Sequence, residues 1–201
     1  MQTALITLAA YLLGSVSFAV LVSRLMRLPD PRSYGSGNPG ATNVLRSGSR
    51  AAAALTLLGD TGKGALAVGL AALYTGQGTV AGVDPPIAGA MALFGHAYPA
   101  FHGFRGGKGV ATAAGVLLAL DPWLGLGALA TFAIVLAFFR MVSLASIAAA
   151  AFAAFWAWVL FGLAPVTPVV AAIALLVIVR HRDNILRIVR GTEPRLGAKK
   201  A

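Results

Sequence analysis

Apolar residues run through the chain in long stretches that short polar segments interrupt. Seven stretches are visible, and they cover residues 3–22, 51–74, 86–101, 110–120, 123–139, 142–161 and 166–179. Runs of this kind predict helices that are hydrophobic all round, and a helix needs about 20 residues to span a bilayer. The pattern therefore predicts an all-α integral membrane protein of about seven transmembrane helices. Three stretches are short (86–101, 110–120 and 166–179), and an adjacent pair that enters and returns on one side would leave five spans.

Composition agrees with a membrane location. The 201 residues are 58% hydrophobic and 11% charged, with a mean hydropathy of +0.82, and a soluble domain of this size could not bury so much apolar surface. Because the connections are short, we expect residues 1–201 to form a single transmembrane domain. The first 22 residues lack a basic leading region, so they predict a retained helix rather than a cleaved signal.

Positive charge lies almost entirely on one side of this arrangement. All 16 lysines and arginines except Lys63 fall in the first, third and fifth connections or in the C-terminal tail, which includes Lys199 and Lys200. Such residues collect in short cytoplasmic loops, so we expect the N-terminus outside and the C-terminus in the cytoplasm. The net charge of +10 then reflects orientation and contact with anionic membrane lipids, and no nucleic acid partner is expected.

The first basic connection combines glycines with polar side chains. Its candidate substrate-binding residues are Gly35, Ser36, Gly37, Asn38, Asn43 and Arg46. Glycines let backbone N–H groups converge on an anion, so an anion site is predicted. The spelling Gly-x-Gly-x-x-Gly also matches a dinucleotide fingerprint, but no strand precedes it and no βαβ unit can fold there. The alternative is a flexible loop whose arginines only set orientation.

The second basic connection, residues 95–109, has the same character. Its candidate substrate-binding residues are His102, Arg105, Gly106, Gly107 and Lys108. Lys108 resembles a P-loop lysine, but the surrounding spacing departs from that motif, so a nucleotide site is not predicted. Arg105, Lys108 and free backbone N–H groups before the next helix instead predict a phosphate cradle. A plain basic turn is the alternative.

Two further pairs of polar residues stand at helical spacing near the same face. Ser143 and Ser146 are three residues apart, as are His181 and Asn184, so each pair shares a helix face. A neutral His at a membrane surface can accept a proton from a hydroxyl, and flanking arginines lower its pKa. The alternatives are serines bonded to their own helix and a basic amphipathic tail lying on lipid headgroups.

Asp60 and Lys63 are three residues apart within an apolar stretch. Isolated charges would be costly there, so we expect them to pair, either as a structural ion pair or as a polar lining beside the site. The chain has no cysteine, which excludes disulfides and thiolate metal sites. No ligand cluster predicts a metal or a cofactor.

With these segments in view, the chain resembles the bacterial acyl-phosphate-dependent glycerol-3-phosphate acyltransferases of the PlsY type. The resemblance is carried by Gly35 through Arg46, by Gly95 through Gly109, and by His181 through Asn184 with Arg187, Gly191 and Glu193. It implies transfer of a fatty acyl group from acyl phosphate to the 1-hydroxyl of sn-glycerol 3-phosphate. The products would be lysophosphatidic acid and inorganic phosphate, the first step of phospholipid synthesis.

The resemblance also implies a place and partners for the reaction. The enzyme would lie in the bacterial cytoplasmic (inner) membrane with its active site on the cytoplasmic face. The soluble enzyme that makes acyl phosphate is a further expected partner. No His has an Asp five positions on, the pattern of other glycerolipid acyltransferases, which favours acyl phosphate over acyl-CoA or acyl carrier protein.

Residue roles follow from the same resemblance. Ser36, Arg46 and Lys108 would bind phosphate and stabilise charge at the carbonyl. His181 and Asn184 would orient the acceptor, and either His181 or a substrate phosphate would take the proton. Ser143 or Ser146 also matches a functional position of the family.

Two other classes of protein remain as alternatives. A transporter or channel for a phosphorylated metabolite is disfavoured because the polar segments gather on one face and no internal repeat is visible. A scaffold that recruits lipid enzymes would leave the dense Ser, Asn and Gly pattern unexplained.

Overall fold

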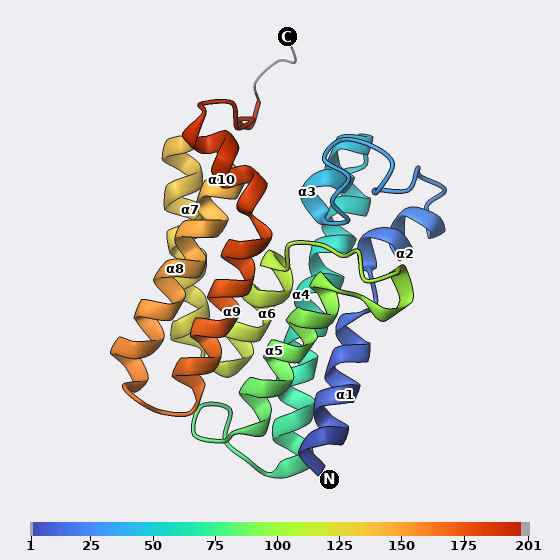
Figure 1. The fold of residues 1–201 in the computed structure, drawn as a ribbon. Helices are drawn as coiled ribbons and strands as arrows, with labels where there is room; N and C mark the ends of the chain where they lie inside the picture. Colours follow the sequence, from blue (N-terminus) through green and yellow to red (C-terminus); the bar gives the residue numbers. More distant parts are fainter. Residues whose placement is uncertain (1, 198–201) are drawn as a thin grey trace.

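The chain folds as a bundle of helices, seen here in a computed structural model that describes residues 2–197. These residues contain no strand (Figure 1). The basic tail residues Lys199 and Lys200 lie outside the described part. The elements are α1 (Gln2–Gly14), α2 (Phe18–Leu25), α3 (Ala41–Val44), η1 (Leu45–Ser47), α4 (Arg50–Thr75), α5 (Asp84–Ala97), η2 (Ala100–His102), α6 (Val110–Leu120), α7 (Pro122–Phe139), α8 (Val142–Phe161), α9 (Val166–Arg180) and α10 (Arg182–Val189).

The apolar stretches correspond to helices, and local signals explain where most of these begin and end. Helix α4 starts after Ser49, whose hydroxyl accepts from Ala52 N at 3.2 Å, and stops at Gly76, whose φ of 67° is left-handed. Helix α5 ends at Ala97, earlier than expected, because the residue before Pro99 is disfavoured in a helix.

The first apolar stretch was expected to form one helix and instead forms two. Helices α1 and α2 meet at an angle of 41° across residues 15–17. Lys63 Nζ on α4 donates to Val16 O at 2.7 Å, which satisfies a carbonyl that the break exposes. Lys63 also lies 2.8 Å from Asp60, and both side chains are almost fully buried. The predicted pairing of these two residues is confirmed.

Two of the described helices, α7 and α8, are each long and apolar enough to span a membrane, and α1 with α2 qualifies as a bent pair. Helix α6 has 11 residues, so it is only about 16 Å long against a hydrocarbon core of about 30 Å. The helices therefore agree with an integral membrane protein, whereas the count of seven spans stays a prediction.

Close helix approach around α6 depends on glycine. A side chain on Gly64 of α4 would overlap Thr112 O, and one on Gly115 of α6 would overlap Thr61 O. Small residues bring membrane helices into this kind of contact. The largest buried cluster surrounds the same helix, with Val116 of α6, Leu124 of α7 and Val170 of α9 inaccessible. Helix α6 is therefore central to the packing.

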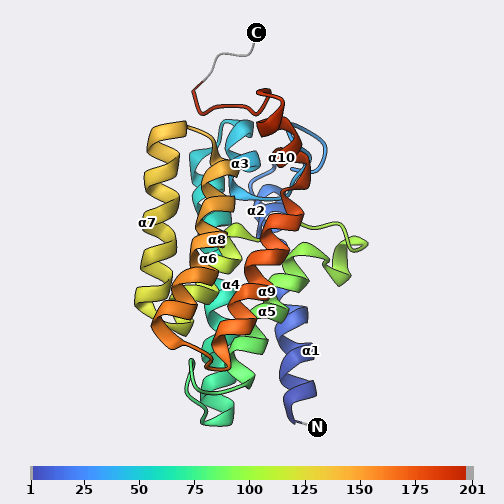
Figure 2. The same ribbon diagram turned by 60° about the vertical axis from the view of Figure 1, so that its left-hand side comes forward.

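The polar segments gather toward one end of the bundle. Figures 1 and 2 show α3 and α10 at the end of the bundle opposite the start of α1, with the loop of residues 98–109 in the same half. The start of α6 lies deeper in the molecule than α3 or α10 (Figure 1). Three segments far apart in the sequence are thereby brought to one half of the fold.

Candidate active site

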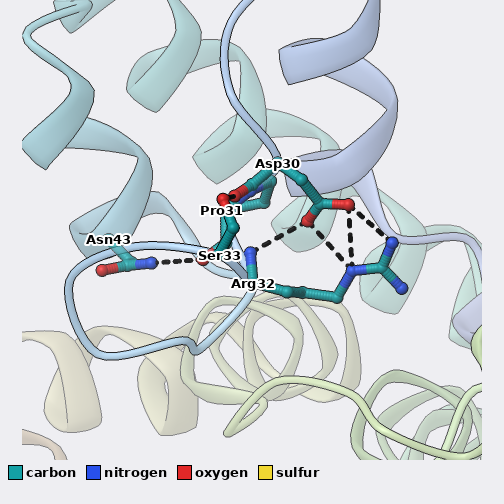
Figure 3. Close-up of polar contacts among 5 residues, drawn as sticks. All are labelled: Asp30, Pro31, Arg32, Ser33 and Asn43. Carbon is teal, nitrogen blue, oxygen red and sulfur yellow. Dashed lines mark hydrogen bonds and ion pairs between the residues drawn. The ribbon is translucent and has the colours of Figure 1, made fainter.

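Asn43 organises the first basic connection from its centre. Its side chain is buried, and its Nδ2 donates to Pro31 O at 2.6 Å and to Tyr34 O at 3.1 Å. Its Oδ1 accepts from Ser36 N at 3.0 Å and from Arg46 Nη1 at 3.3 Å. Figure 3 shows Asn43 reaching Pro31 beside the Asp30–Arg32 ion pair. Asn43 therefore connects the start of this loop to Ser36 and Arg46.

The predicted anion-binding side chains of this loop remain accessible. Ser36 and Arg46 are exposed, and Asn38 is half-buried. Gly35 and Gly37 have left-handed φ values of 61° and 66°, and a side chain on Gly35 would overlap Asn43 Oδ1. These glycines let the chain pass close to Asn43 while Ser36 and Arg46 face outward.

The glycines of the second connection lie against the end of α5. Gly106 N donates to Ala97 O at 3.2 Å, and Gly107 N donates to His96 O at 3.1 Å. A side chain on Gly107 would overlap the imidazole of His96. The prediction of free N–H groups is therefore wrong for Gly106 and Gly107.

Free donors are found a few residues later, at the start of α6. The first N–H groups of a helix have no partner within it, and none of the described residues accepts from the N–H groups of Val110, Ala111 and Thr112, whereas Ala113 N donates to Gly109 O at 2.7 Å. Gly109 precedes this helix with a φ of 81° and supplies no side-chain cap. The start of α6 therefore offers an anion unpaired backbone donors directly after Lys108.

A polar network joins Lys108 to two other segments. Lys108 Nζ donates to Asn184 Oδ1, and Asn184 Nδ2 donates to Glu193 Oε1 at 2.6 Å. Ser143 donates to the same Glu193 oxygen at 2.5 Å, while Arg187 Nε donates to Oε2 at 2.8 Å. The start of α8, the helix α10 and the end of the second loop thus meet around one carboxylate.

The charges of this network follow from its surroundings. Burial favours a raised pKa for Glu193, but hydrogen bonds from Ser143, Asn184 and Arg187 outweigh it and lower the pKa below its ordinary value. Burial also lowers the pKa of Lys108, partly opposed by Glu193. The carboxylate therefore stays ionised and offers oxygens that can only accept.

His181 is the single residue between α9 and α10, and it is buried. Its Nδ1 lies 2.7 Å from Val177 O, so Nδ1 carries the proton and Nε2 is the basic nitrogen. Burial lowers the pKa of His181 to about 4, partly opposed by the Val177 hydrogen bond. His181 is therefore neutral at pH 7, as the sequence led us to expect for a proton acceptor.

Other predicted residues lie outside this network. Ser146 donates to Val142 O of its own helix at 2.8 Å, and Arg105 is exposed. His102 lines a pocket of about 170 Å³ between α2 and η2. Within residues 2–197, no hydrogen bond links Ser36 or Arg46 to Lys108 or Asn184.

Sequence reasoning assigned no role to three residues of this network. Arg187 and Glu193 were named only as residues that carry the family resemblance, and Arg180 was counted only among the basic charges, yet Glu193 accepts from Ser143, Asn184 and Arg187, and Arg180 donates to the carbonyls of the second loop. A usable signal for Arg187 was its spacing of three residues from Asn184. Residues 2–197 contain no group of three His, Asp or Glu side chains that could hold a metal.

Comparisons with known proteins agree on one family. The family model described as glycerol-3-phosphate acyltransferase matches residues 4–191. A glycerol-3-phosphate acyltransferase of Ralstonia nicotianae is 56% identical over 98% of this chain and 96% of its own length. One from Thiobacillus denitrificans is 52% identical over 97% and 98%.

Solved structures give the same result. A crystal structure of PlsY, an integral membrane glycerol 3-phosphate acyltransferase in its glycerol 3-phosphate form, superposes with a TM-score of 0.91 at 36% identity, covering 98% of this chain and 96% of that one. Its lysophosphatidic acid form superposes with a TM-score of 0.90 at 35% identity, with the same coverage.

Proposed function

The chain belongs to the glycerol-3-phosphate acyltransferase family, and from this premise we propose that its acyl donor is a fatty acyl phosphate. The 1-hydroxyl of sn-glycerol 3-phosphate attacks the acyl carbonyl, the bond between that carbon and the phosphate oxygen breaks, and inorganic phosphate leaves. The other product is lysophosphatidic acid, the compound named with one solved relative. An acyl phosphate is an activated anhydride, so the protein need only position the reactants and stabilise charge.

The observation that carries the proposal is the network of Lys108, Asn184, Glu193 and Ser143 beside the open start of α6. It joins motifs from three parts of the chain next to free backbone donors. Two phosphate groups must be bound, one on the acceptor and one on the donor, and the fold offers two basic Gly-rich loops. Lys108 with α6 would bind one phosphate, and Ser36 with Arg46 the other.

His181 and Asn184 would orient the acceptor hydroxyl. Two atoms can take its proton: the neutral Nε2 of His181 or an oxygen of a substrate phosphate. Lys108 and the N-terminus of α6 would stabilise the negative charge that develops on the carbonyl oxygen. No step requires a metal or a cofactor.

The location follows from the charge pattern. We infer seven spans, an outside N-terminus and a cytoplasmic active site in the bacterial inner membrane, because the basic loops lie in the same half of the fold as the network. The acyl chain would enter sideways from the lipid. A soluble enzyme that makes acyl phosphate would be the partner that delivers the donor.

The test is to give the purified protein in detergent glycerol 3-phosphate with palmitoyl phosphate, and in parallel with palmitoyl-CoA. Lysophosphatidic acid should form only from the acyl phosphate. Lys108→Ala and Ser36→Ala should each lose about 100-fold or more in kcat/KM, the scale of a removed charge-stabilising donor. Arg190→Ala, an exposed arginine of the tail, is the control and should keep full activity. Product from acyl-CoA alone would overturn the proposed donor.

A further inference from the structure

A single guanidinium binds the carbonyl side of the Gly-rich loop. Arg180, the last residue of α9, donates from Nη2 to Gly106 O at 2.9 Å and from Nε to Gly107 O at 3.2 Å. None of the described acidic residues pairs with Arg180. Its donors are therefore directed at two successive peptide groups rather than at a carboxylate.

Arg180 is itself fixed by the other end of the same loop. Its Cζ lies 5.2 Å from the centre of the Tyr98 ring, within the range of a cation–π contact. Tyr98 is held in turn, because its carbonyl accepts from Tyr11 OH at 2.9 Å. The guanidinium thus touches both the beginning and the end of the loop that leads to Lys108.

The peptides before Lys108 are held on both sides. Their N–H groups donate to Ala97 and His96 of α5, and their carbonyls accept from Arg180 of α9. Glycine has no side chain that could be held, so these backbone bonds, together with the close packing on His96, set the direction in which the chain reaches Lys108.

Two cross-links between the same segments lie in register. Arg180 binds Gly107, and Asn184 binds Lys108, so neighbouring residues of the loop meet residues four apart at the α9–α10 junction. The contact of Arg180 with Gly107 therefore fixes the position at which Lys108 meets Asn184. Loss of this contact would let the loop shift relative to α10 while Lys108 and Asn184 were both still present.

We propose that Arg180 is a positioning residue for the acyl transfer: its guanidinium holds the Gly106 and Gly107 carbonyls so that Lys108 meets Asn184 at the start of α6. This inference rests on the proposed function, since it assigns Arg180 a part in the same site. Lysine cannot replace it, because an ammonium lacks the planar, forked donors that reach two carbonyls while stacking on a ring.

The test compares Arg180→Lys with Arg182→Lys in the detergent assay. Arg182 lies two residues away, its side chain is 80% exposed, and its only ion pair among residues 2–197 is a 3.7 Å contact with Asp183. Both variants keep the charge of the chain. Thermal unfolding of each protein is measured in the same detergent, and KM for each substrate is measured separately from kcat.

Arg180→Lys should lower kcat/KM about tenfold or more, within the roughly 100-fold that a 1 Å misplacement can cost. Lys108→Ala should raise KM for one of the two substrates, and Arg180→Lys should raise KM for that same substrate. Arg182→Lys should match the wild type. Tyr98→Leu, which removes the ring under the guanidinium, should give a smaller loss of the same kind.

Equal kinetics for Arg180→Lys and Arg182→Lys would overturn the inference. It would also be overturned if Arg180→Lys lowered kcat and the unfolding temperature together and left both KM values unchanged, because that pattern reports less folded enzyme. An inactive wild type would instead contradict the proposed function, so the two failures are distinguishable.

Discussion

The chemistry of individual residues in this site is set by contacts from distant parts of the chain. Lys108, Asn184 and Ser143 could be named from sequence because they stand in unusual polar spacings next to apolar stretches. Arg180 could not, because nothing local distinguishes it from the other arginines of a basic tail, and Glu193 was named for the family resemblance without a role. Only the fold shows that Glu193 accepts from three donors and that Arg180 binds a loop more than 70 residues earlier.

The lowered pKa of His181 predicts how stability depends on pH. The pKa is about 4 in the folded protein against an ordinary 6.5. As pH falls from about 6.5 to about 4, the unfolded chain takes up a proton that the folded protein does not bind. The contribution of His181 to the free energy of unfolding is therefore fully present above pH 6.5 and is lost progressively as the pH falls through this range. Between pH 7.5 and pH 5 the loss should be about 2 kcal/mol.

Thermal unfolding at pH 7.5 and pH 5 measures this effect. His181→Asn, which keeps an amide donor for Val177 O and cannot titrate, should lose less stability than the wild type on acidification. The same pH dependence in both proteins would contradict the buried neutral His181.

At the scale of elements, the apolar pattern gave helix positions to within a few residues where Pro, Gly or a capping side chain marked the ends. It did not reveal the break between α1 and α2, because the short interruption by Gly14, Ser15 and Ser17 was read as part of one apolar stretch. A contact that accompanies the break comes from another helix: Lys63 reaches Val16 across 47 positions of sequence. A pattern read along one segment contains no information of that kind.

The break predicts that Lys63 is required for stability. Lys63→Met would leave Asp60 buried with only His96 Nδ1, at 3.5 Å, beside it and Val16 O without its donor, and breaking a buried ion pair in this way costs about 3–5 kcal/mol. The measurement is thermal unfolding in detergent. Leu66→Met, an exposed position on the same helix, is the control and should unfold like the wild type.

A second substitution tests the cause. Adding Asp60→Asn to Lys63→Met removes the unpaired charge, so the double variant should recover part of the lost stability. A Lys63→Met protein as stable as the wild type would show that the pair is not needed, and a double variant less stable than the single one would show that the charge is not the problem.

At the scale of the whole molecule, the polar segments lie toward one end, and the charge pattern predicts that this end faces the cytoplasm. The absence of cysteine from the chain allows a direct test. Leu163→Cys lies in the α8–α9 connection at a site that is 95% exposed, and Arg190→Cys lies in the exposed tail. In intact cells a membrane-impermeant maleimide should label only Leu163→Cys.

Permeabilised cells provide the control, since both cysteines should then react. Labelling of Arg190→Cys alone in intact cells would invert the orientation, and labelling of both would place the two connections on the same side. Either result would remove the basis for a cytoplasmic active site.

The short length of α6 affects the free energy needed to bring a fatty acyl donor to the proposed site. A helix about 16 Å long cannot carry its first turn to the surface that α10 and α3 reach, so the anion-binding end of α6 stands at a recessed level. Each methylene drawn out of lipid into water costs about 0.8 kcal/mol. In the reaction we propose, the water-soluble alcohol therefore descends to the acyl carbonyl at this recessed level, and the fatty tail stays in the bilayer throughout the transfer.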